Sequence, residues 1–328
     1  MTVRATFEVD PPEWAERLAI LESVGLADAD VDARAQVVDQ RGGTATLEFP
    51  ALAEETDAGV LVSALVAGEW GDRADMRSCR LVAVEWPPGL PGPAFAPADR
   101  PVVGAIVKPA LGLRPDEAAA TAGELAAGGA VLVKDDELLM SPAYSPLEER
   151  TRRIAERLPP GVRYAANVTG PHEGLLARAE TAVAAGAGAL MLNAFAQGLP
   201  ALQALRDATF GVPIFAHRVG AAFLRRGDRV SVAAGVLAEL TLLLGADYVQ
   251  VGSFGPRTFD TDDEIHEQIA TCRGRATAVI GGGVGPANAR DQLERAGDPA
   301  GLMLLLGSEA YAHPDGVRAG VAATVAAL

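Results

Sequence analysis

The sequence has little positive charge, few cysteines and no long apolar run. Its 328 residues carry a formal net charge of -15 without a block of lysine or arginine, which argues against nucleic acid and anionic membranes as partners. No run of about 18 apolar residues occurs, and the first residues, MTVRATFEVD, lack the basic and apolar regions of a leader. Cys79 and Cys272 form no CxxC pair, as expected in a reducing compartment. These absences predict a cytoplasmic protein.

Lysine is also scarce. Of 28 basic residues only two, Lys108 and Lys134, are lysines, and the others are arginines. An amine can lose its proton and act as a base or nucleophile, whereas a guanidinium stays charged. We therefore interpret both lysines as candidates for chemistry that arginine cannot perform.

The N-terminal part is predicted to follow the order β-α-β-β-α-β, a ferredoxin-like α+β pattern. The expected elements are strands at 5–9, 37–38, 44–49 and 81–86 and helices at 11–24 and 57–67. The proline-rich segment 87–101 suits a semi-rigid linker. We expect an N-terminal domain of residues 1–97 and a second domain of residues 98–328.

From residue 102 onward, apolar strand-like runs alternate eight times with helical stretches, which predicts a (β/α)8 TIM barrel. The expected strands are 102–107, 130–133, 163–167, 189–192, 213–216, 247–251, 276–280 and 301–306. The expected helices are 115–127, 146–157, 175–187, 202–208, 231–244, 263–272, 286–296 and 314–327. A doubly wound open sheet is the alternative α/β fold.

The chemistry of a barrel lies where its strands end. Functional groups are concentrated at the predicted ends, which carry Lys108, the run Lys134-Asp135-Asp136-Glu137, Asn167, Asn193, His217-Arg218, Gln250, Gly281-Gly282-Gly283 and Gly307-Ser308. Both lysines fall on this rim, which chance placement does not favour.

The run after the second barrel strand predicts a metal site. Period-two alternation puts Lys134 and Asp136 on one side, and Glu137 can follow once the strand breaks. Two carboxylates are hard ligands of the kind Mg²⁺ prefers, and a lysine amine becomes a third oxygen ligand if it adds CO2 to form a carbamate. The alternatives are a salt bridge at the strand end or a helix cap.

The remaining strand-end residues allow functional and structural interpretations. Lys108 can carry protons to or from an enolate, or serve only as a counter-ion to the acidic cluster. Arg218 suits an anion, and His217 can hydrogen-bond a substrate hydroxyl or be structural. The glycines after the seventh and eighth strands let backbone N–H groups approach a phosphate, but glycine clusters are also ordinary turns.

Two segments carry a family resemblance. IVKPALGL (106–113) and VKDDE (133–137) resemble paired signatures of the RuBisCO large subunit, and the likeness continues through YAANVTG, AHR, GADYVQVGS, the triple glycine and LLLGSEAYAHPDG. The resemblance implies a barrel preceded by a small α+β domain. It further implies that CO2 carbamylates Lys134, that Asp136 and Glu137 complete the Mg²⁺ site, and that Lys108 serves enolisation.

The resemblance also implies a set of substrate-binding residues, to which the ends of the third and sixth strands add Asn167 and Gln250. The set is Arg218, Asn167, Gln250, Gly282, Gly283, Gly307 and Ser308, with His217 as a catalytic candidate that contacts the substrate. In the family, the region around Glu69 reaches the neighbouring subunit's site. We therefore expect a homodimer or an oligomer of dimers in which Glu69 binds substrate across the interface.

Departures from the family pattern change the expected reaction. Ala110, Ala221 and Gln250 stand where the family has a lysine and two histidines, and the loop after strand six has Arg257 but no lysine to hold incoming CO2. The resemblance therefore implies a RuBisCO-like protein, not a true ribulose bisphosphate carboxylase.

The expected function is a Mg²⁺-dependent lyase or isomerase. The substrate class is a sugar-derived keto compound, with or without a phosphate, that forms an enolate during tautomerisation, isomerisation or decarboxylation. Methionine-salvage enolases of the family use a lysine near the position of Glu69, which argues against that reaction here. The alternatives are an aldolase that forms a Schiff base through Lys134 or Lys108, and a barrel that binds a sugar acid without turnover.

Overall fold

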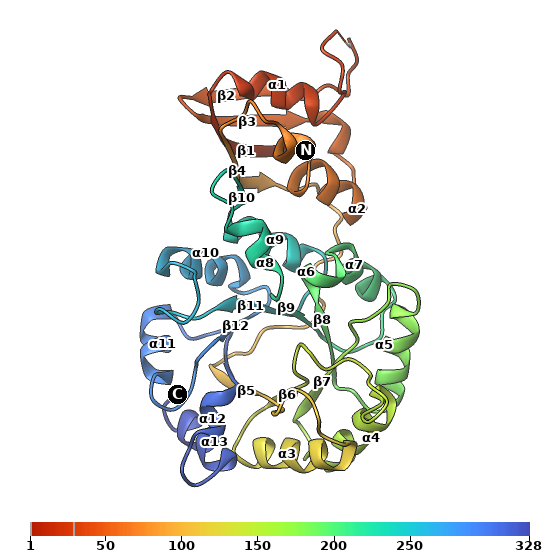
Figure 1. Ribbon diagram of the computed structural model, residues 1–328, viewed down its shortest axis with the longest axis vertical. Coiled ribbons are helices and arrows are strands. Elements are labelled where there is room, and N and C mark those ends of the chain that lie inside the picture. The colour runs from red at the N-terminus through yellow and green to blue at the C-terminus, as the bar shows by residue number, and fades with distance from the viewer. Residues whose placement is uncertain (1, 29) are drawn as a thin grey trace.

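The computed structural model describes residues 2–28 and 30–328. A small sheet with its helices, formed by the N-terminal residues, stands against one side of a closed barrel (Figure 1). The expected fold class, a (β/α)8 barrel preceded by an α+β sheet unit, is confirmed, and the open-sheet alternative is wrong because the barrel strands form a closed ring.

The N-terminal sheet has the ferredoxin-like strand order. Its elements are β1 (Val3–Asp10), α1 (Trp14–Leu21), β2 (Gln36–Arg41), β3 (Thr44–Phe49), α2 (Ala58–Leu61) and β4 (Ser78–Glu85). β1 lies between β3 and β4, β2 pairs with β3, and all of these pairs are antiparallel. Alternate residues of β1 are buried, so one face of the sheet packs against helices, as period-two patterning predicts.

The predicted helix at 57–67 divides into two parts. The Asp57 side chain caps α2 by accepting from the amides of Gly59 (2.7 Å) and Val60 (3.2 Å). After α2 the chain continues as a π-helical turn, Val62–Val66, and then as the 3-10 turn η3, Glu69–Asp72.

A strand from the barrel half extends the N-terminal sheet. β10 (Val230–Val232) pairs in parallel with Cys79–Leu81 of β4, whereas a helix was predicted from residue 231. The helix α9 (Ala234–Leu243) begins three residues later. A three-residue segment is too short to show the alternation of apolar and polar residues that predicts a strand. β10 forms because the edge of β4 is open for pairing.

Eight parallel strands close the barrel in the order β11-β12-β13-β5-β6-β7-β8-β9. Their bounds are β5 (Val102–Ile106), β6 (Leu132–Lys134), β7 (Arg163–Asn167), β8 (Ala189–Asn193), β9 (Ile214–His217), β11 (Tyr248–Gly252), β12 (Thr277–Gly281) and β13 (Leu302–Leu306). Each agrees with its predicted strand to within two residues at either end, because runs buried on both faces are a strong local signal.

Helices surround the barrel strands. The longer ones are α3 (Pro115–Ala127), α4 (Leu147–Arg157), α5 (Leu175–Ala184), α7 (Pro200–Asp207), α9, α10 (Asp262–Cys272), α11 (Ala289–Ala296) and α13 (Val317–Val325). Three short helices shape the C-terminal mouth, namely α6 (Ala194–Gln197), α8 (Ala221–Arg225) and α12 (Ser308–Tyr311).

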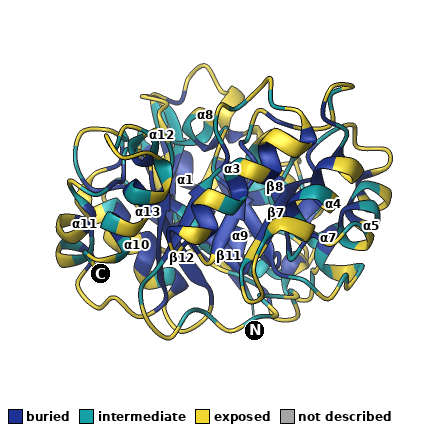
Figure 2. Ribbon diagram, turned by 90° about the horizontal axis from the view of Figure 1, so that it is seen from below, coloured by how far each residue is buried: buried dark blue, intermediate teal, exposed yellow. Residues whose placement is uncertain are grey.

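Side chains fill the barrel interior, so it is not a channel. A buried cluster inside the ring includes Met191, Phe215 and Met303, and a Cβ on Gly104 would lie 2.7 Å from the Met303 sulfur. The strands and α9 are buried while the outer helix faces are exposed (Figure 2). A filled interior leaves the strand ends as the place for a site.

Within residues 2–28 and 30–328, every helix is too short or too polar to cross a membrane.

Candidate active site

The ends of β5 and β6 bring both lysines to the barrel mouth. Lys134 is the last residue of β6 and is completely buried. Lys108 follows β5 by two residues, and its side chain is 30% exposed. The Lys108 ammonium forms an ion pair with Asp136, whose side chain is 1% exposed. One lysine is therefore sealed within the site and the other is accessible to a ligand.

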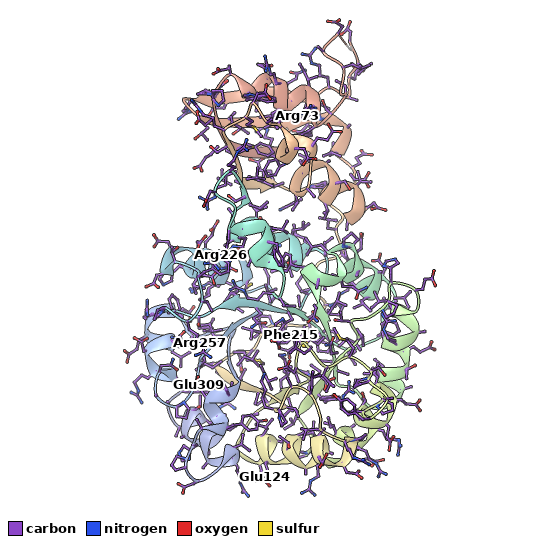
Figure 3. The ribbon with its side chains drawn as sticks, in the orientation of Figure 1. Arg73, Glu124, Phe215, Arg226, Arg257 and Glu309 are labelled. Carbon is purple, nitrogen blue, oxygen red and sulfur yellow. The ribbon has the colours of Figure 1, made fainter. Side chains whose placement is uncertain are left out.

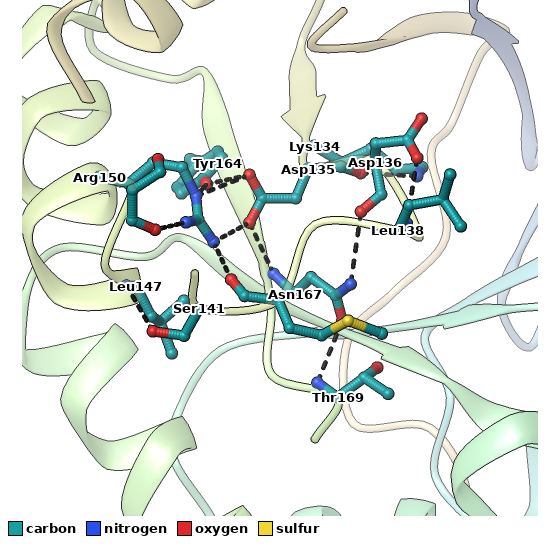
Figure 4. A network of polar contacts seen from close by, with 12 residues as sticks. Lys134, Asp135, Asp136, Leu138, Ser141, Leu147, Arg150, Tyr164, Asn167 and Thr169 are labelled. Atoms are coloured by element: carbon teal, nitrogen blue, oxygen red, sulfur yellow. Dashed lines mark hydrogen bonds and ion pairs between the residues drawn. The ribbon is translucent and has the colours of Figure 1, made fainter. Parts of the chain in front are cut away.

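Asp135 points away from this mouth into a buried polar network (Figure 4). Arg150 donates to both carboxylate oxygens, from Nε at 3.1 Å and from Nη2 at 3.0 Å. The Tyr164 hydroxyl and the Asn167 amide (3.0 Å) also donate to this carboxylate. Because Asp135 is held on the outer side, its neighbours Lys134 and Asp136 face the opposite side.

The Lys134 amine is buried between an aromatic ring and the acidic run. Its Nζ donates to the Asp135 carbonyl (2.8 Å), lies 4.0 Å from Glu137 Oε2 and sits 5.7 Å from the centre of the Phe215 ring. Burial lowers the pKa of Lys134 to about 8, although the nearby carboxylates of Glu137 and Asp136 oppose this effect. A neutral amine is thus accessible near physiological pH.

His217, at the end of β9, completes the cluster from across the mouth. Its Nδ1 accepts from the Val219 amide (3.2 Å), and its Nε2 lies 3.5 Å from Glu137 Oε2. Burial, together with the charges of Lys134 and Arg218, holds the pKa of His217 well below its usual value. A neutral ring that accepts at Nδ1 carries its proton on Nε2, which faces the cluster.

Two asparagines hold the backbone of the acidic run. Asn167 donates to the carbonyls of Asp136 and Glu137, both at 3.3 Å, and Asn193 donates to the Glu137 carbonyl at 2.8 Å. Asn167 was predicted to bind substrate, but its side-chain amide is engaged with the protein. These hydrogen bonds hold the backbone that carries the two carboxylates, and the binding of substrate by Asn167 stays a prediction.

Arg218 is engaged with a carboxylate from a later loop. It donates to the Val251 carbonyl (2.6 Å) and lies 2.9 Å from Asp260, which also pairs with Arg225. Burial alone would raise the pKa of Asp260, but the two arginines hold it below its usual value. Asp260 lies eight residues beyond β11, so sequence reasoning had no signal to connect it with Arg218.

The other predicted binding residues have different surroundings. Gly282 and Gly283 have φ of +116° and +74°, and a Cβ on them would meet Thr258 at 2.9 Å and Arg257 at 2.8 Å. These glycines therefore allow the β11–α10 loop to pack over β12, whether or not a phosphate binds. Gly307 is partly exposed and Ser308 is exposed at the mouth, and Gln250 Oε1 is buried without a hydrogen-bond partner.

Glu69 lies in η3 of the N-terminal part. Its exposed carboxylate pairs with Arg73 at 3.3 Å, and the next amide, that of Trp70, donates to half-buried Glu22 at 2.7 Å. Within one chain, Glu69 is therefore not part of the lysine and carboxylate cluster.

Tyr311 is a site residue that sequence reasoning missed. From α12 its hydroxyl donates to the Ile106 carbonyl (2.9 Å) and accepts from the Lys108 amide (2.8 Å). The ladder between β13 and β5 ends at Leu306 and Ala105, so the hydroxyl takes the place of a strand partner. It fixes the backbone from which the Lys108 side chain projects.

Asp136 and Glu137 do not form a metal site by themselves. Among the residues that the structure describes, no group of three His, Cys, Asp or Glu side chains is arranged to hold a metal ion. Glu137 Oε2 is nevertheless buried without a hydrogen-bond partner. A buried carboxylate oxygen in this state is suited to a further cation, and a third oxygen ligand would have to come from elsewhere.

Comparisons with known proteins give consistent relatives. The model for the catalytic domain of the ribulose bisphosphate carboxylase large chain matches residues 95–275. An uncharacterised RuBisCO-like protein of Bordetella bronchiseptica is 30% identical over 94% of this chain and 80% of its own. A 3-oxo-isoapionate-4-phosphate decarboxylase of Rhizobium rhizogenes is 30% identical over 98% of this chain and 79% of its own. The octameric RuBisCO of Pyrococcus horikoshii superposes with a TM-score of 0.88 at 27% identity, over 99% of this chain and 89% of that one.

Replacing Asp135 by Asn should destabilise the protein. The change leaves the buried Arg150 guanidinium without its counter-charge, which costs on the order of 3 kcal/mol of unfolding free energy. Urea denaturation measures the loss. The matched control is Asp75→Asn, because Asp75 and its partner Arg17 are each 65% exposed and such pairs contribute little. Equal midpoints for the two variants would contradict the anchoring role of Asp135.

Replacing Tyr311 by Phe should release the end of β5. The Lys108 amide loses its acceptor and should exchange its hydrogen faster, as measured by mass spectrometry on a peptide that contains residues 107 and 108. Tyr144→Phe is the control, since the Tyr144 hydroxyl accepts from the Gly112 amide at 3.0 Å in the same loop. Unchanged exchange in the Tyr311 variant would show that its hydroxyl does not hold Lys108.

Proposed function

The chain belongs to the RuBisCO large-chain family, and on that premise we propose that it is a RuBisCO-like, Mg²⁺-dependent enzyme that forms an enolate from a sugar-derived keto compound. The observation that carries the proposal is the convergence of both lysines with Asp136 and Glu137 at one end of the barrel. In a chain whose other Lys and Arg positions are all arginine, two lysines at one site indicate amine chemistry.

The donor set fits Mg²⁺ once Lys134 is carbamylated. Asp136 and Glu137 supply two hard oxygen ligands, and the carbamate of Lys134 would supply the third. Burial favours the neutral Lys134 amine that CO2 requires. The hydrogen bonds of Asn167 and Asn193 to the backbone of the acidic run hold both carboxylates in place.

When bound, Mg²⁺ would polarise the substrate's keto oxygen and stabilise the charge of the enolate. The remaining roles belong to the chain's own residues. Lys108 is the proton carrier, because its amine is partly exposed at the mouth and Tyr311 fixes its backbone. The Nε2–H of neutral His217 is positioned to donate to a substrate oxygen.

We favour decarboxylation of a β-keto acid over isomerisation. The bond to the carboxyl carbon breaks, its electron pair passes to the keto group as the enolate, and Lys108 then protonates the enolate carbon. One support is the likeness to a 3-oxo-isoapionate-4-phosphate decarboxylase. Another is the loop after β11, which has no lysine to retain CO2.

A Schiff-base aldolase is the second candidate. A buried amine whose pKa is about 8, close to an aromatic ring, is also suited to attack a carbonyl. Borohydride reduction would attach a keto substrate covalently to Lys134 in an aldolase, whereas the proposed enzyme would lose activity with EDTA and give no adduct.

We further propose that the active protein contains a second copy. Large apolar side chains are exposed in the loops and in α8 at the C-terminal mouth, with Leu111 at 53%, Leu138 at 58% and Phe223 at 92%. An apolar rim around a site suits a protein partner. In the proposed dimer this rim receives the partner's N-terminal part, which brings Glu69 to the substrate.

Replacing Lys134 by Arg should abolish carbamate formation. With ¹³C-bicarbonate and Mg²⁺, the wild-type protein should give a carbamate signal in ¹³C NMR, and bicarbonate should strengthen Mg²⁺ binding in calorimetry. Arginine cannot form this carbamate, so both effects should vanish in Lys134→Arg. Lys108→Arg is the matched control that changes the only other lysine, and it should retain the signal. A signal that persists without Lys134 would refute the metal site.

Replacing Phe223 by Glu should weaken the proposed dimer. A charge placed in a desolvated apolar interface is unfavourable, so sedimentation should show a smaller species than the wild type at equal concentration. Leu176→Glu, on the outer face of α5 where the side chain is 44% exposed, is the control. If all three proteins sediment alike, the mouth is not the interface.

A further inference from the structure

We infer that Arg226 and Arg257 form an oxyanion-binding site at the barrel mouth, which takes the phosphoryl or carboxylate group of the substrate in place of Arg218. The inference rests on the proposed function for the nature of the ligand. The site itself rests on the charges, the cleft and the packing around these two arginines.

Arg218 is unsuited to the role predicted for it, because Asp260 already occupies its guanidinium. The Asp260 carboxylate is fully buried between Arg218 and Arg225, and the Arg218 side chain is only 15% exposed. A substrate anion would have to displace a buried carboxylate that two arginines stabilise. That exchange is unfavourable compared with binding to cations that lack a partner.

The neighbouring charges leave two cations uncompensated. Four arginines, Arg218, Arg225, Arg226 and Arg257, lie on this side of the mouth, and the carboxylates paired with any of them are Asp260 and Glu264. Arg225 pairs with both, the second at 3.0 Å, and Arg218 shares the first. In the described part of the chain, neither Arg226 nor Arg257 has a carboxylate within 4.0 Å, although the whole protein carries a net charge of -15.

The two free arginines line one cleft. Arg226 follows α8 and Arg257 lies in the loop after β11, on the same side of the barrel (Figure 3). They border a cleft of about 540 Å³ with Phe259, Thr258 and His217. Arg218 lines the same cleft. His217 borders both this cleft and the lysine and carboxylate cluster, because its Nε2 lies 3.5 Å from Glu137 Oε2. A substrate with its keto group at that cluster can extend its anionic end between the arginines.

The side chains of Arg226 and Arg257 pack against neighbouring groups of the protein itself. The Phe259 ring lies 4.5 Å from the Arg226 guanidinium carbon, and Arg225 and Arg218 approach the same ring at 4.9 and 5.5 Å. The electron-rich ring face offsets part of the repulsion among these cations. Arg257 is seated on Gly283, where an added Cβ would lie 2.8 Å from its Cγ. Cations ordered in this way lose less entropy on binding.

The chemistry of the cleft selects an oxyanion. Guanidinium groups donate in pairs to phosphoryl or carboxylate oxygens. Phosphate esters and carboxylates share this recognition, so the two sources are separated by using inorganic phosphate and malonate as probes.

The test measures the binding of each probe by calorimetry at low ionic strength, without Mg²⁺ or bicarbonate. Arg226→Gln and Arg257→Gln should each weaken the preferred probe about tenfold or more, as expected when a charged hydrogen-bond partner is lost. Arg100→Gln, an exposed arginine at the opposite end of the barrel, is the matched control and should leave the affinity within about twofold of the wild type, since a distant charge is screened. Tighter binding of phosphate than of malonate indicates a phosphorylated substrate, and tighter binding of malonate indicates a sugar acid.

Two more variants distinguish a preorganised site from non-specific attraction of the anionic probe to positive charge. Phe259→Leu keeps every charge but removes the ring that orders Arg226, so it should still weaken the probe. Arg218→Gln should have little effect on probe binding provided that its circular dichroism matches the wild type. The inference is overturned if Arg226→Gln and Arg257→Gln bind like the wild type, or if Arg218→Gln alone abolishes binding in a folded protein.

The same assay in the Lys134→Arg background distinguishes this inference from the proposed function. Probe binding that persists there and depends on both arginines supports the oxyanion site even if no carbamate forms. The opposite result is also informative. If the wild type forms the carbamate but the arginine variants bind the probes normally, the proposed enolate chemistry is supported and the oxyanion site is overturned.

Discussion

The buried carboxylate of Asp135 is the constraint on which the site depends. It accepts from Arg150, from Tyr164 and from the Asn167 amide, and it is completely desolvated. A charge in this position is tolerated only because its partners are fixed. Since β6 has only three residues, this network, more than the strand ladder, sets the direction in which Lys134 and Asp136 point.

Two buried carboxylates orient the mouth from opposite sides of the barrel. Asp135 engages Arg150 behind β6, and Asp260 engages Arg218 and Arg225 behind the loop after β11. Each carboxylate forms ion pairs with buried arginines. On the side of Asp135, Glu137 stays open to a ligand, and on the side of Asp260, Arg226 and Arg257 do. In the proposed enzyme, arginine supplies the structural and anion-binding cations and lysine the reactive amines, as their different proton affinities require.

Sequence reasoning located the parts of the site that depend on local order along the chain. Eight apolar runs and the residues that follow them place Lys108, Lys134 and His217 at one mouth, because all parallel strands end at the same side. Asp260, Tyr311 and β10 were not predictable in this way. Their partners lie 42, 203 and about 150 residues away in sequence, and only the folded chain brings them together.

The pairing of Arg218 with Asp260 also limits what the substrate can be. A barrel mouth that offered Arg218, Arg226 and Arg257 together would favour two well-separated anionic groups on one ligand. With Arg218 neutralised internally, the remaining cations on this side match a single oxyanion, and the apolar faces of Phe259 and Val219 border the rest of the cleft. A β-keto acid that carries one further phosphoryl or carboxylate group keeps that group for the arginines to hold when its reacting carboxylate leaves as CO2. The internal ion pair and the proposed decarboxylation therefore point to the same class of ligand.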